Sequence, residues 1–317
     1  MRIAAACCAV VCSIVVAPAG AAYPERPVRV IVGLAPGGGT DTIARIMTQK
    51  LSDLFNQSFV IDNRPSSGGN IAGELLARAQ PDGYTLLVIT PTHVVNPSLF
   101  TDIRYNVLRD FSAVVNMVYS QYALSVRTSV PANTVAEFIA LAKSAQPKIL
   151  YASSGIGTAN HLSAELFKSM AGVDMTHVPY KGSAPAMSAL LAGEVQVLFS
   201  SLGGLIPHVK AGRLRTLGVT GPKRTPSAPE IPTIAEAGVP GYEVSGWYGL
   251  ATTAKTPAAT IERLNAAVNR ALPELRERYA AIGADIAGGS ATEFGAYLKS
   301  ELEKWARVVK ASGAKVE

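Results

Sequence analysis

The chain has 317 residues, of which 48% are hydrophobic and 16% are charged. This composition provides for a large buried core, argues against a disordered chain and favours two domains over one. Without Arg2, which lies in a predicted leader, the chain carries 28 basic and 23 acidic residues, a net charge of +5. Because no Lys/Arg cluster is interleaved with aromatic residues, nucleic-acid binding is not expected. A mild positive charge suits a small anionic ligand.

Residues 1–22 have the pattern of an export signal. Arg2 gives the positive start, Ile3–Val16 are almost wholly apolar, and the candidate cleavage sites end at Ala19, Ala21 and Ala22. A membrane helix is the alternative, but this run is shorter than the roughly 20 residues of a span. We therefore expect a mature protein in the periplasm that is not embedded in the membrane.

The three cysteines, Cys7, Cys8 and Cys12, all lie in this leader, so the mature chain has none. Disulfides, thiol catalysis and thiolate zinc sites are thereby excluded. Lipid attachment at Cys12 is disfavoured, because Val11 is bulky where a lipoprotein signal has a small residue.

Strand-like and helix-like segments alternate in the first part of the mature chain. We expect strands at Val28–Val32, Phe59–Ile61 and Tyr84–Ile89, with helices at Asp41–Leu54 and Asn70–Ala79 between them. Asn70 is the expected cap of the second helix. This βαβαβ order predicts a parallel sheet with helices on its faces.

A second unit repeats the alternation after a junction near 119–127. The expected strands are Ile149–Ala152, Met175–Tyr180, Val195–Phe199 and Leu214–Val219, and the expected helices are Asn160–Met170, Ala184–Leu191 and Leu205–Lys210. These segments predict a second parallel-type sheet.

The remaining chain returns toward the first unit. A Pro- and Gly-rich segment after Thr220 predicts a long connection over the surface. A strand-like run then passes through a second crossing near 243–250, and two helices follow, Ala258–Leu272 and Ala291–Lys310. Trp305 is expected to pack inward.

The glycine run after the first strand is the first candidate site. Ligands of open parallel sheets bind at the carboxyl ends of strands, where helices begin. Gly37, Gly38 and Gly39 have no Cβ to keep a ligand away, and Thr40 or Asp41 is the expected cap. A nucleotide is disfavoured, because the loop lacks the lysine of a phosphate loop and the third glycine of a dinucleotide motif. A tight turn that binds nothing is the alternative.

Other strand ends carry similar polar groups. The richest is Ser153–His161, where Ser153, Ser154, Thr158 and Asn160 crowd at a helix start. Lys181, with Ser183 as expected cap, and Ser200–Gly204 follow two further strands. Thr90, Thr92 and His93 follow the third strand and are candidates for ligand contact. An ordinary role within the loop explains them equally well. Singly these groups are explained by helix capping; together they predict one crevice rich in hydrogen-bond donors.

Little in the sequence indicates catalysis. No G-x-S-x-G motif is present, and the four histidines show no metal-ligand spacing. His161 is expected to pack at its helix start and His177 to be a core or edge residue. We therefore expect no enzyme activity, no metal and no cofactor.

Several motifs in order along the mature chain resemble one family. They are "YPERPVRVIVGLAPGGGTDTIAR", "VIDNRPSSGGNIAGE", "YASSGIGTANHLSAELFK", "VPYKGSAPAMSALLAGEVQVLFSSL", "PHVKAGRLRTLGVT" and "PGYEVSGWYGL". The chain resembles the periplasmic substrate-binding proteins of tripartite tricarboxylate transporters, of the Bug or TctC type. The resemblance implies an α/β two-domain clamshell, the type II or Venus-flytrap periplasmic-binding-protein fold, that closes on a small carboxylate.

The resemblance also implies which residues contact the ligand. In the first lobe they are Leu34, Pro36, Gly37, Gly38, Gly39, Thr40 and Asp41; in the second they are Ser153, Ser154, Gly155, Gly157, Thr158, Asn160, His161, Tyr180, Lys181 and Gly182, with Ser200 and Ser201 at the next strand end. Leu34 stands where the family often has phenylalanine, which implies less aromatic cover over the ligand. Ser200 stands where an aspartate is frequent, which argues against an amino-acid ligand.

The expected organisation is a leader at 1–22, one lobe at 23–122 plus 247–317, another at 123–246, and hinges near 119–127 and 243–250. The expected function is capture of a di- or tricarboxylate or an aromatic acid for inner-membrane permease subunits, by a monomer. A secreted enzyme and a sensory module that use the same cleft are the alternatives.

Overall fold

The computed structural model describes residues 23–180, 182–225 and 228–312. The expected leader, residues 1–22, and the candidate Lys181 lie outside the described residues. The elements in chain order are β1 (Val28–Val32), α1 (Gly39–Phe55), β2 (Phe59–Asn63), the 3-10 turn η1 (Ser67–Gly69), α2 (Asn70–Ala77), β3 (Thr85–Ile89), α3 (Pro91–Leu99), α4 (Val107–Asp110), β4 (Phe111–Arg127), α5 (Val135–Ser144), β5 (Ile149–Ser153), α6 (Ala159–Ala171), β6 (Met175–Pro179), α7 (Ser183–Ala192), β7 (Val197–Ser201), α8 (Leu202–Lys210), β8 (Leu214–Val219), β9 (Ser245–Thr253), α9 (Ala258–Ala280), β10 (Ala284–Ile286) and α10 (Ala291–Ser312).

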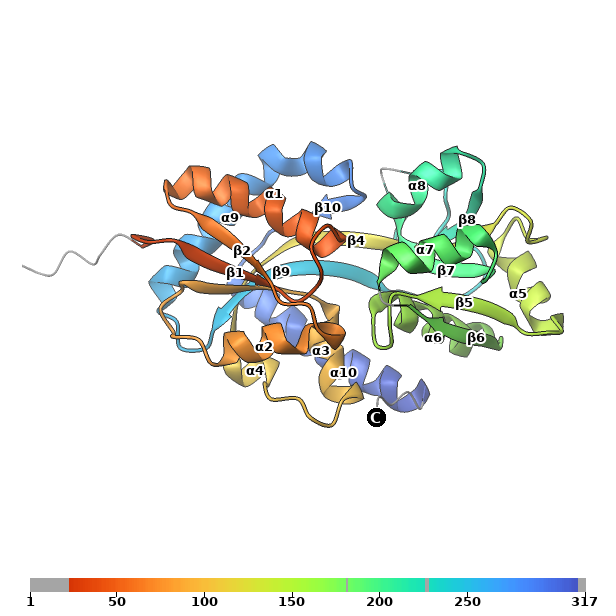
Figure 1. Ribbon diagram of the computed structural model, residues 1–317, viewed down its shortest axis with the longest axis horizontal. Coiled ribbons are helices and arrows are strands. Elements are labelled where there is room, and N and C mark those ends of the chain that lie inside the picture. The colour runs from red at the N-terminus through yellow and green to blue at the C-terminus, as the bar shows by residue number, and fades with distance from the viewer. Residues whose placement is uncertain (1–22, 181, 226–227, 313–317) are drawn as a thin grey trace, which may run out of the picture.

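The first sheet has the strand order β2-β1-β3-β9-β4-β10 (Figure 1). β1 pairs in parallel with β2 and β3, whereas β9 runs antiparallel to β3 and β4. Val28, Val30 and Val32 of β1 pack with α1 and α9 on one face, and Ile31 packs with α2 and α3 on the other. Burial on both faces explains why four of the five residues of this strand are β-branched, with Arg29 as the half-buried exception.

The second sheet has the order β6-β5-β7-β4-β8, with β5, β6 and β7 parallel and both β7 and β8 antiparallel to β4. The long strand β4 belongs to both sheets, since Gln121 pairs with Ser245 of β9 and Tyr122 pairs with Ser201 of β7. Both sheets are therefore mixed, around parallel three-stranded cores. The sequence pattern predicts only a junction here, and β4 itself is missed.

The connection from β8 to β9 corrects a second prediction. Ile234, Val239 and Tyr242 in this segment are buried, and the Tyr242 hydroxyl donates to the Ser163 carbonyl at 2.9 Å. The segment therefore packs into the second half of the fold instead of only crossing its surface. Its apolar side chains, hidden among prolines and glycines, anchor it there.

The segment after β3 was expected as a loop and is instead the helix α3. Pro91 stands at the first helical position, where its missing N–H costs nothing.

In helix α10, Trp305 packs inward as predicted and is 1% exposed. The Glu301 carboxylate accepts from the indoles of Trp305 and Trp247 at 3.0 and 3.1 Å, which fixes α10 against β9. In the described ranges, no helix combines the length and apolarity of a membrane span.

Candidate functional site

The loop between β1 and α1 presents its glycine run at the surface. Gly37, Gly38 and Gly39 are exposed, as is Pro36, and Leu34 is half-buried. Gly37 has a φ of 80°, in the left-handed region that favours glycine. Gly38 is the N-cap residue, so the prediction that Thr40 or Asp41 caps α1 is wrong.

The first turn of α1 leaves its amides available. The first intrahelical bond runs from the Thr42 N–H to the Gly38 carbonyl at 2.9 Å, and the N-cap has no side-chain hydrogen bond. The N–H groups of Gly39, Thr40 and Asp41 precede that bond, so an acceptor outside the helix is needed to satisfy them. This is the backbone chemistry of an anion site.

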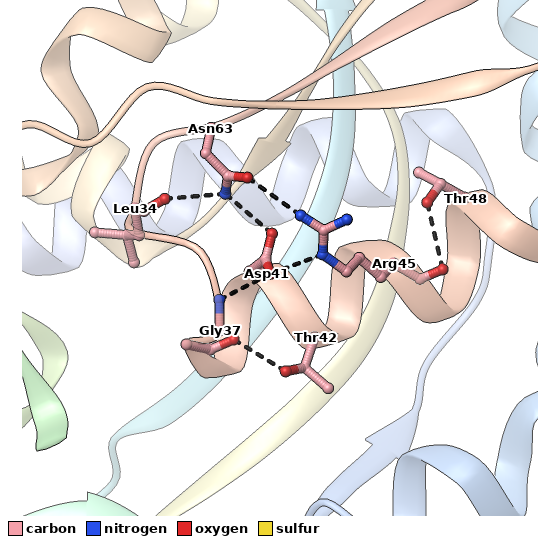
Figure 2. Close-up of polar contacts among 8 residues, drawn as sticks. Leu34, Gly37, Asp41, Thr42, Arg45, Thr48 and Asn63 are labelled. Carbon is pink, nitrogen blue, oxygen red and sulfur yellow. Dashed lines mark hydrogen bonds and ion pairs between the residues drawn. The ribbon is translucent and has the colours of Figure 1, made fainter.

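Asp41 holds this loop through hydrogen bonds to Gly37, Asn63 and Arg45, as Figure 2 shows. Its carboxylate accepts from the Gly37 N–H at 2.9 Å, from Arg45 Nε at 2.8 Å and from the Asn63 amide at 3.0 Å. The same Asn63 amide donates to the Leu34 carbonyl at 3.2 Å. The Asp41 carboxylate is therefore fully engaged within the protein, and its role is to position the main chain of the loop.

Electrostatics agree with this bracing role. Burial alone would raise the pKa of Asp41, but the hydrogen bonds from Arg45, Gly37 and Asn63 outweigh burial and hold that pKa below its ordinary value. The carboxylate is consequently anionic at neutral pH, and Arg45 balances its charge. An anion bound at this loop therefore contacts the amide N–H groups while Arg45 offsets the negative charge of Asp41.

The candidates after β3 lie at the start of α3 and bond to one another. The hydroxyls of Thr90 and Thr92 are 2.9 Å apart, and His93 Nδ1 accepts from the Thr90 N–H at 3.2 Å. Burial lowers the pKa of His93 to about 4, so this imidazole is neutral at pH 7. A Cβ placed on Gly69 would lie 3.1 Å from His93 Nε2. These side chains therefore support the turn ahead of α2.

The loop between β5 and α6 folds on two glycines with positive φ, Gly155 and Gly157. Thr158 is the N-cap of α6 but makes no capping bond; its hydroxyl donates to the Gly155 carbonyl at 2.7 Å. The Ser153 hydroxyl accepts from the Gly155 N–H at 3.1 Å and lies 2.6 Å from His177 Nε2. The polar side chains thus shape the loop, while the first-turn amides of α6 remain available.

Ser154 and Asn160 tie this loop to the neighbouring strand. The Ser154 hydroxyl donates to Asn160 Oδ1 at 3.0 Å, and the Asn160 amide donates to the Phe199 carbonyl of β7 at 2.7 Å. The start of α6 is therefore held directly over the end of β7.

His161 packs at its helix start, as predicted. Its Nδ1 accepts from the Gly157 N–H at 3.2 Å, which leaves the ring proton on Nε2. The ring stacks on His177 at 4.2 Å between centroids, and His177 stacks on Tyr151 at 4.8 Å. Burial lowers the pKa of His161 and takes that of His177 to about 4. Both histidines are thus neutral packing groups under the loop at pH 7.

The two remaining strand ends are adjacent to this loop. The Tyr180 N–H donates to the Ser153 carbonyl at 3.0 Å, but its hydroxyl donates to Glu194 at 3.2 Å, so only the Tyr180 main chain stays near the loop. Gly182 is the N-cap of α7, which makes the prediction of Ser183 as cap wrong.

At the end of β7, Ser200 is buried and Ser201 is the N-cap of α8, again without a side-chain capping bond. Ser201 pairs with Tyr122 of β4. This third helix start of the second sheet therefore lies beside the strand that both sheets share.

Contacts between the two sheets bring these loops toward the first group. A Cβ on Gly157 would lie 2.6 Å from Leu99 Cδ1 at the end of α3. A Cβ on Gly203, at the start of α8, would lie 2.2 Å from the Ile282 carbonyl oxygen ahead of β10. The starts of α6 and α8 therefore lie against elements of the first half of the fold, next to α3 and to the residues ahead of β10.

Sequence reasoning missed three polar residues at this junction. Tyr122 and Tyr248 are about nine-tenths buried in β4 and β9, and a Cβ on Gly39 would lie 4.0 Å from the Tyr248 hydroxyl oxygen. The amide of Asn96, in α3, donates to Asn70 Oδ1 at 2.5 Å, so Asn70 serves this contact and is not the predicted cap. No local motif marks these residues, because strand pairing and helix packing place them.

A metal centre finds no support in the described part of the chain. No group of three or more His, Cys, Asp and Glu side chains within the described ranges is arranged to hold a metal ion.

Three solved structures share this fold over nearly the whole chain. Rpa4515 of R. palustris, solved with adipate, is 37% identical, with a TM-score of 0.85 and coverage of 93% of this chain and 100% of its own. The periplasmic binding protein BugD is 31% identical, with a TM-score of 0.84 and the same coverage. MatC from Rhodopseudomonas palustris, with bound malate, is 32% identical, with a TM-score of 0.82 and coverage of 90% and 100%. The fold is that of a periplasmic binding protein, as predicted.

Residues 43–314 match the family model described as "Tripartite tricarboxylate transporter family receptor". This chain belongs to that family. It is a solute-binding receptor of a transport system and not an enzyme, which confirms the sequence-based prediction of its class.

Proposed function

We propose that this receptor captures a small dicarboxylate between the loop ends of its two sheets. Adipate and malate, bound by two relatives, are both dicarboxylates. The candidate loops supply amide N–H groups in both sheets, so each end of such a ligand has its own set of donors. The net charge of +5 after removal of the leader favours an anion of this kind.

One observation supports this proposal above the others. α1, α6, α7 and α8 all begin at the ends of parallel strands, and none of them has a side-chain cap. Asn106 caps α4 and Thr134 caps α5, whereas α9 begins at Pro257 without a side-chain cap, and α3, at the end of β3, has a capping box of Thr90 and His93. The helix starts at the proposed site therefore keep their amides for a ligand.

The energies are sufficient for this binding mode without a metal or an arginine clamp. A micromolar complex needs about 8 kcal/mol net. Charge-assisted hydrogen bonds contribute roughly 1.5–3 kcal/mol each, and a helix start adds about 0.3–1 kcal/mol. Half a dozen donors around two carboxylates meet this requirement after several kcal/mol are lost to immobilisation.

We further propose that the ligand closes two lobes, 23–122 plus 247–317 and 123–246, about hinges near 119–127 and 243–250. Within these hinge ranges, β4 passes from pairing with β9 at Gln121 to pairing with β7 at Tyr122. The proposed leader, 1–22, exports the chain to the periplasm, and the closed form delivers its ligand to membrane permease subunits.

Isothermal titration with adipate, malate, citrate and an aromatic acid tests the proposal, with native mass spectrometry to identify any ligand retained through purification. The site variant is Gly38→Val. Its added side chain projects from an exposed residue with an extended backbone, where the nearest heavy atom to a Cβ is the Ala35 carbonyl at 3.5 Å. The fold should therefore persist while dicarboxylate binding is lost.

Gly295→Val in α10 is the matched control, because a Cβ there meets only Ala113 at 3.9 Å. It should bind as the wild type does. A Gly38→Val variant with normal affinity would show that the glycine loop is not the binding site, and a wild type that binds no carboxylate of the panel would refute the proposed ligand class.

A further inference from the structure

We propose that Tyr248 is a ligand-binding residue, whose hydroxyl donates to the carboxylate held at the start of α1, and that Tyr122 positions it. This inference rests on the proposed function and adds a side-chain donor to the main-chain donors of the site. It assigns a role to two buried phenols, one in β4, which both sheets share, and one in the neighbouring strand β9.

The hydroxyl of Tyr248 lies beside the first turn of α1. A Cβ on Gly39 would be 4.0 Å from this oxygen, and the side chain of Thr40, the next residue of the helix, is close enough to lower the pKa of the phenol. Gly39 and Thr40 are two of the residues whose amides await an external acceptor. A carboxylate bound there therefore lies within reach of the phenol.

Tyr122 of β4 and Tyr248 of β9 lie on the same face of the sheet that these strands form. Tyr248 follows Gly246 by two residues, so the two positions point to the same face. A Cβ on Gly246 would lie 2.5 Å from Tyr122 Cε2, which shows that the Tyr122 ring occupies the space left by this glycine. Tyr122 thus lies across Gly246 and next to Tyr248. The position needs glycine so that the phenols can meet.

Tyr248 has a protonated hydroxyl at neutral pH. Burial raises the pKa of Tyr122 well above its ordinary value, and the interaction with Tyr248 raises it further. Burial also raises the pKa of Tyr248, and this effect outweighs the interactions with Tyr122 and Thr40 that lower it. Tyr248 therefore carries an O–H that can donate to a ligand.

That O–H needs an acceptor near α1. No carboxylate or carbonyl oxygen among the residues that the structure describes takes this proton. A ligand carboxylate is an acceptor-only group, and it would satisfy the phenol and the adjacent helix amides at once. Because Tyr248 projects from a buried strand, its donor is held in place before the ligand arrives.

Tyr248→Phe removes the hydroxyl and keeps the ring. Isothermal titration with adipate and malate should give a Kd about 10- to 100-fold weaker, as expected for one lost bond to a charged group. Tyr122→Phe should weaken binding less, because the Tyr248 donor remains. Loss of a buried hydroxyl should lower the urea midpoint of each ligand-free variant modestly, and both variants should remain folded at the titration temperature, which separates lost binding from unfolding.

Tyr119→Phe is the matched control. Tyr119 also belongs to β4 but pairs with Trp247, on the opposite face, and packs on Tyr297 of α10. It should bind normally. If Gly38→Val loses binding while Tyr248→Phe keeps the wild-type Kd, this inference alone is overturned. If Gly38→Val also binds normally, the proposed site is wrong, and the role of Tyr248 falls with it.

Discussion

The shape of the glycine loop depends most directly on the carboxylate of Asp41. Asp41→Asn removes its charge and disrupts its bonds to Gly37, Arg45 and Asn63. We expect the free energy of unfolding at pH 7 to fall by about 1–3 kcal/mol, measured by urea denaturation. Asp53→Asn, an exposed position on the same helix, should have little effect.

The pH dependence of this difference follows from the lowered pKa of Asp41. A carboxyl group with a depressed folded pKa stabilises the fold above its unfolded value, here 3.8, and loses that contribution as the pH falls through the folded value. The difference in the free energy of unfolding between wild type and Asp41→Asn should therefore be largest at pH 6 and decrease below pH 4. A gap independent of pH would contradict the assignment of this charge to loop bracing.

His93 gives a second pH-dependent prediction at the residue scale. Burial lowers its pKa from 6.5 to about 4, so between these values the unfolded chain binds a proton that the folded chain excludes. The contribution of neutral His93 to the free energy of unfolding is complete above pH 6.5, and about 3 kcal/mol of it is lost as the pH falls to 4. Urea denaturation from pH 7 to 4 should show a shallower decline for His93→Gln. Equal slopes of unfolding free energy against pH for wild type and His93→Gln would contradict the burial of a neutral imidazole at this position.

Local sequence patterns predicted those strands and loops whose structure depends only on their own segment of the chain. β1, β3, β5 and β8 were found because β-branched or apolar runs end at turn residues, and the glycine loops were found because a strand, glycines and a helix follow in order. β4 was missed because its pairing with β9 shifts between Ala113 and Val115 and again between Asn116 and Val118. These irregularities interrupt the alternation by which a strand is recognised.

Helix α3 and the tyrosine pair were missed for different reasons. Pro91 and Pro97 in the α3 segment read as breakers, although the first helical position tolerates proline. Tyr122 and Tyr248 belong to segments far apart in the sequence, and only the pairing of β4 with β9 brings them together. The helix-start amides of the site were therefore predictable from the sequence, while the side chain now assigned to the ligand depends on the tertiary fold.

For the whole molecule, binding depends on how closely the two sheets approach each other. At Gly203 of α8 and Gly283 before β10 the backbones of both halves come very close: a Cβ on Gly203 would lie 2.2 Å from the Ile282 carbonyl oxygen, and a Cβ on Gly283 would lie 2.6 Å from the Gly203 nitrogen. A ligand that bridges both halves favours this arrangement over any more open one, in proportion to its difference in affinity for the two. A side chain at this contact should therefore oppose binding from outside the site.

Gly203→Ala tests this argument. The added Cβ would lie 2.2 Å from the Ile282 carbonyl oxygen, and a backbone atom cannot move aside as a flexible side chain does. We expect the Kd for adipate to rise at least about tenfold, and the urea midpoint of the ligand-free protein to fall, because the backbone contact must shift to accept the Cβ. Small-angle scattering should show compaction on adding adipate to the wild type but not to the variant. Gly204→Ala, whose Cβ meets only Ser201 Oγ at 3.3 Å, should compact normally. Normal compaction and affinity in Gly203→Ala would mean that this contact does not limit closure.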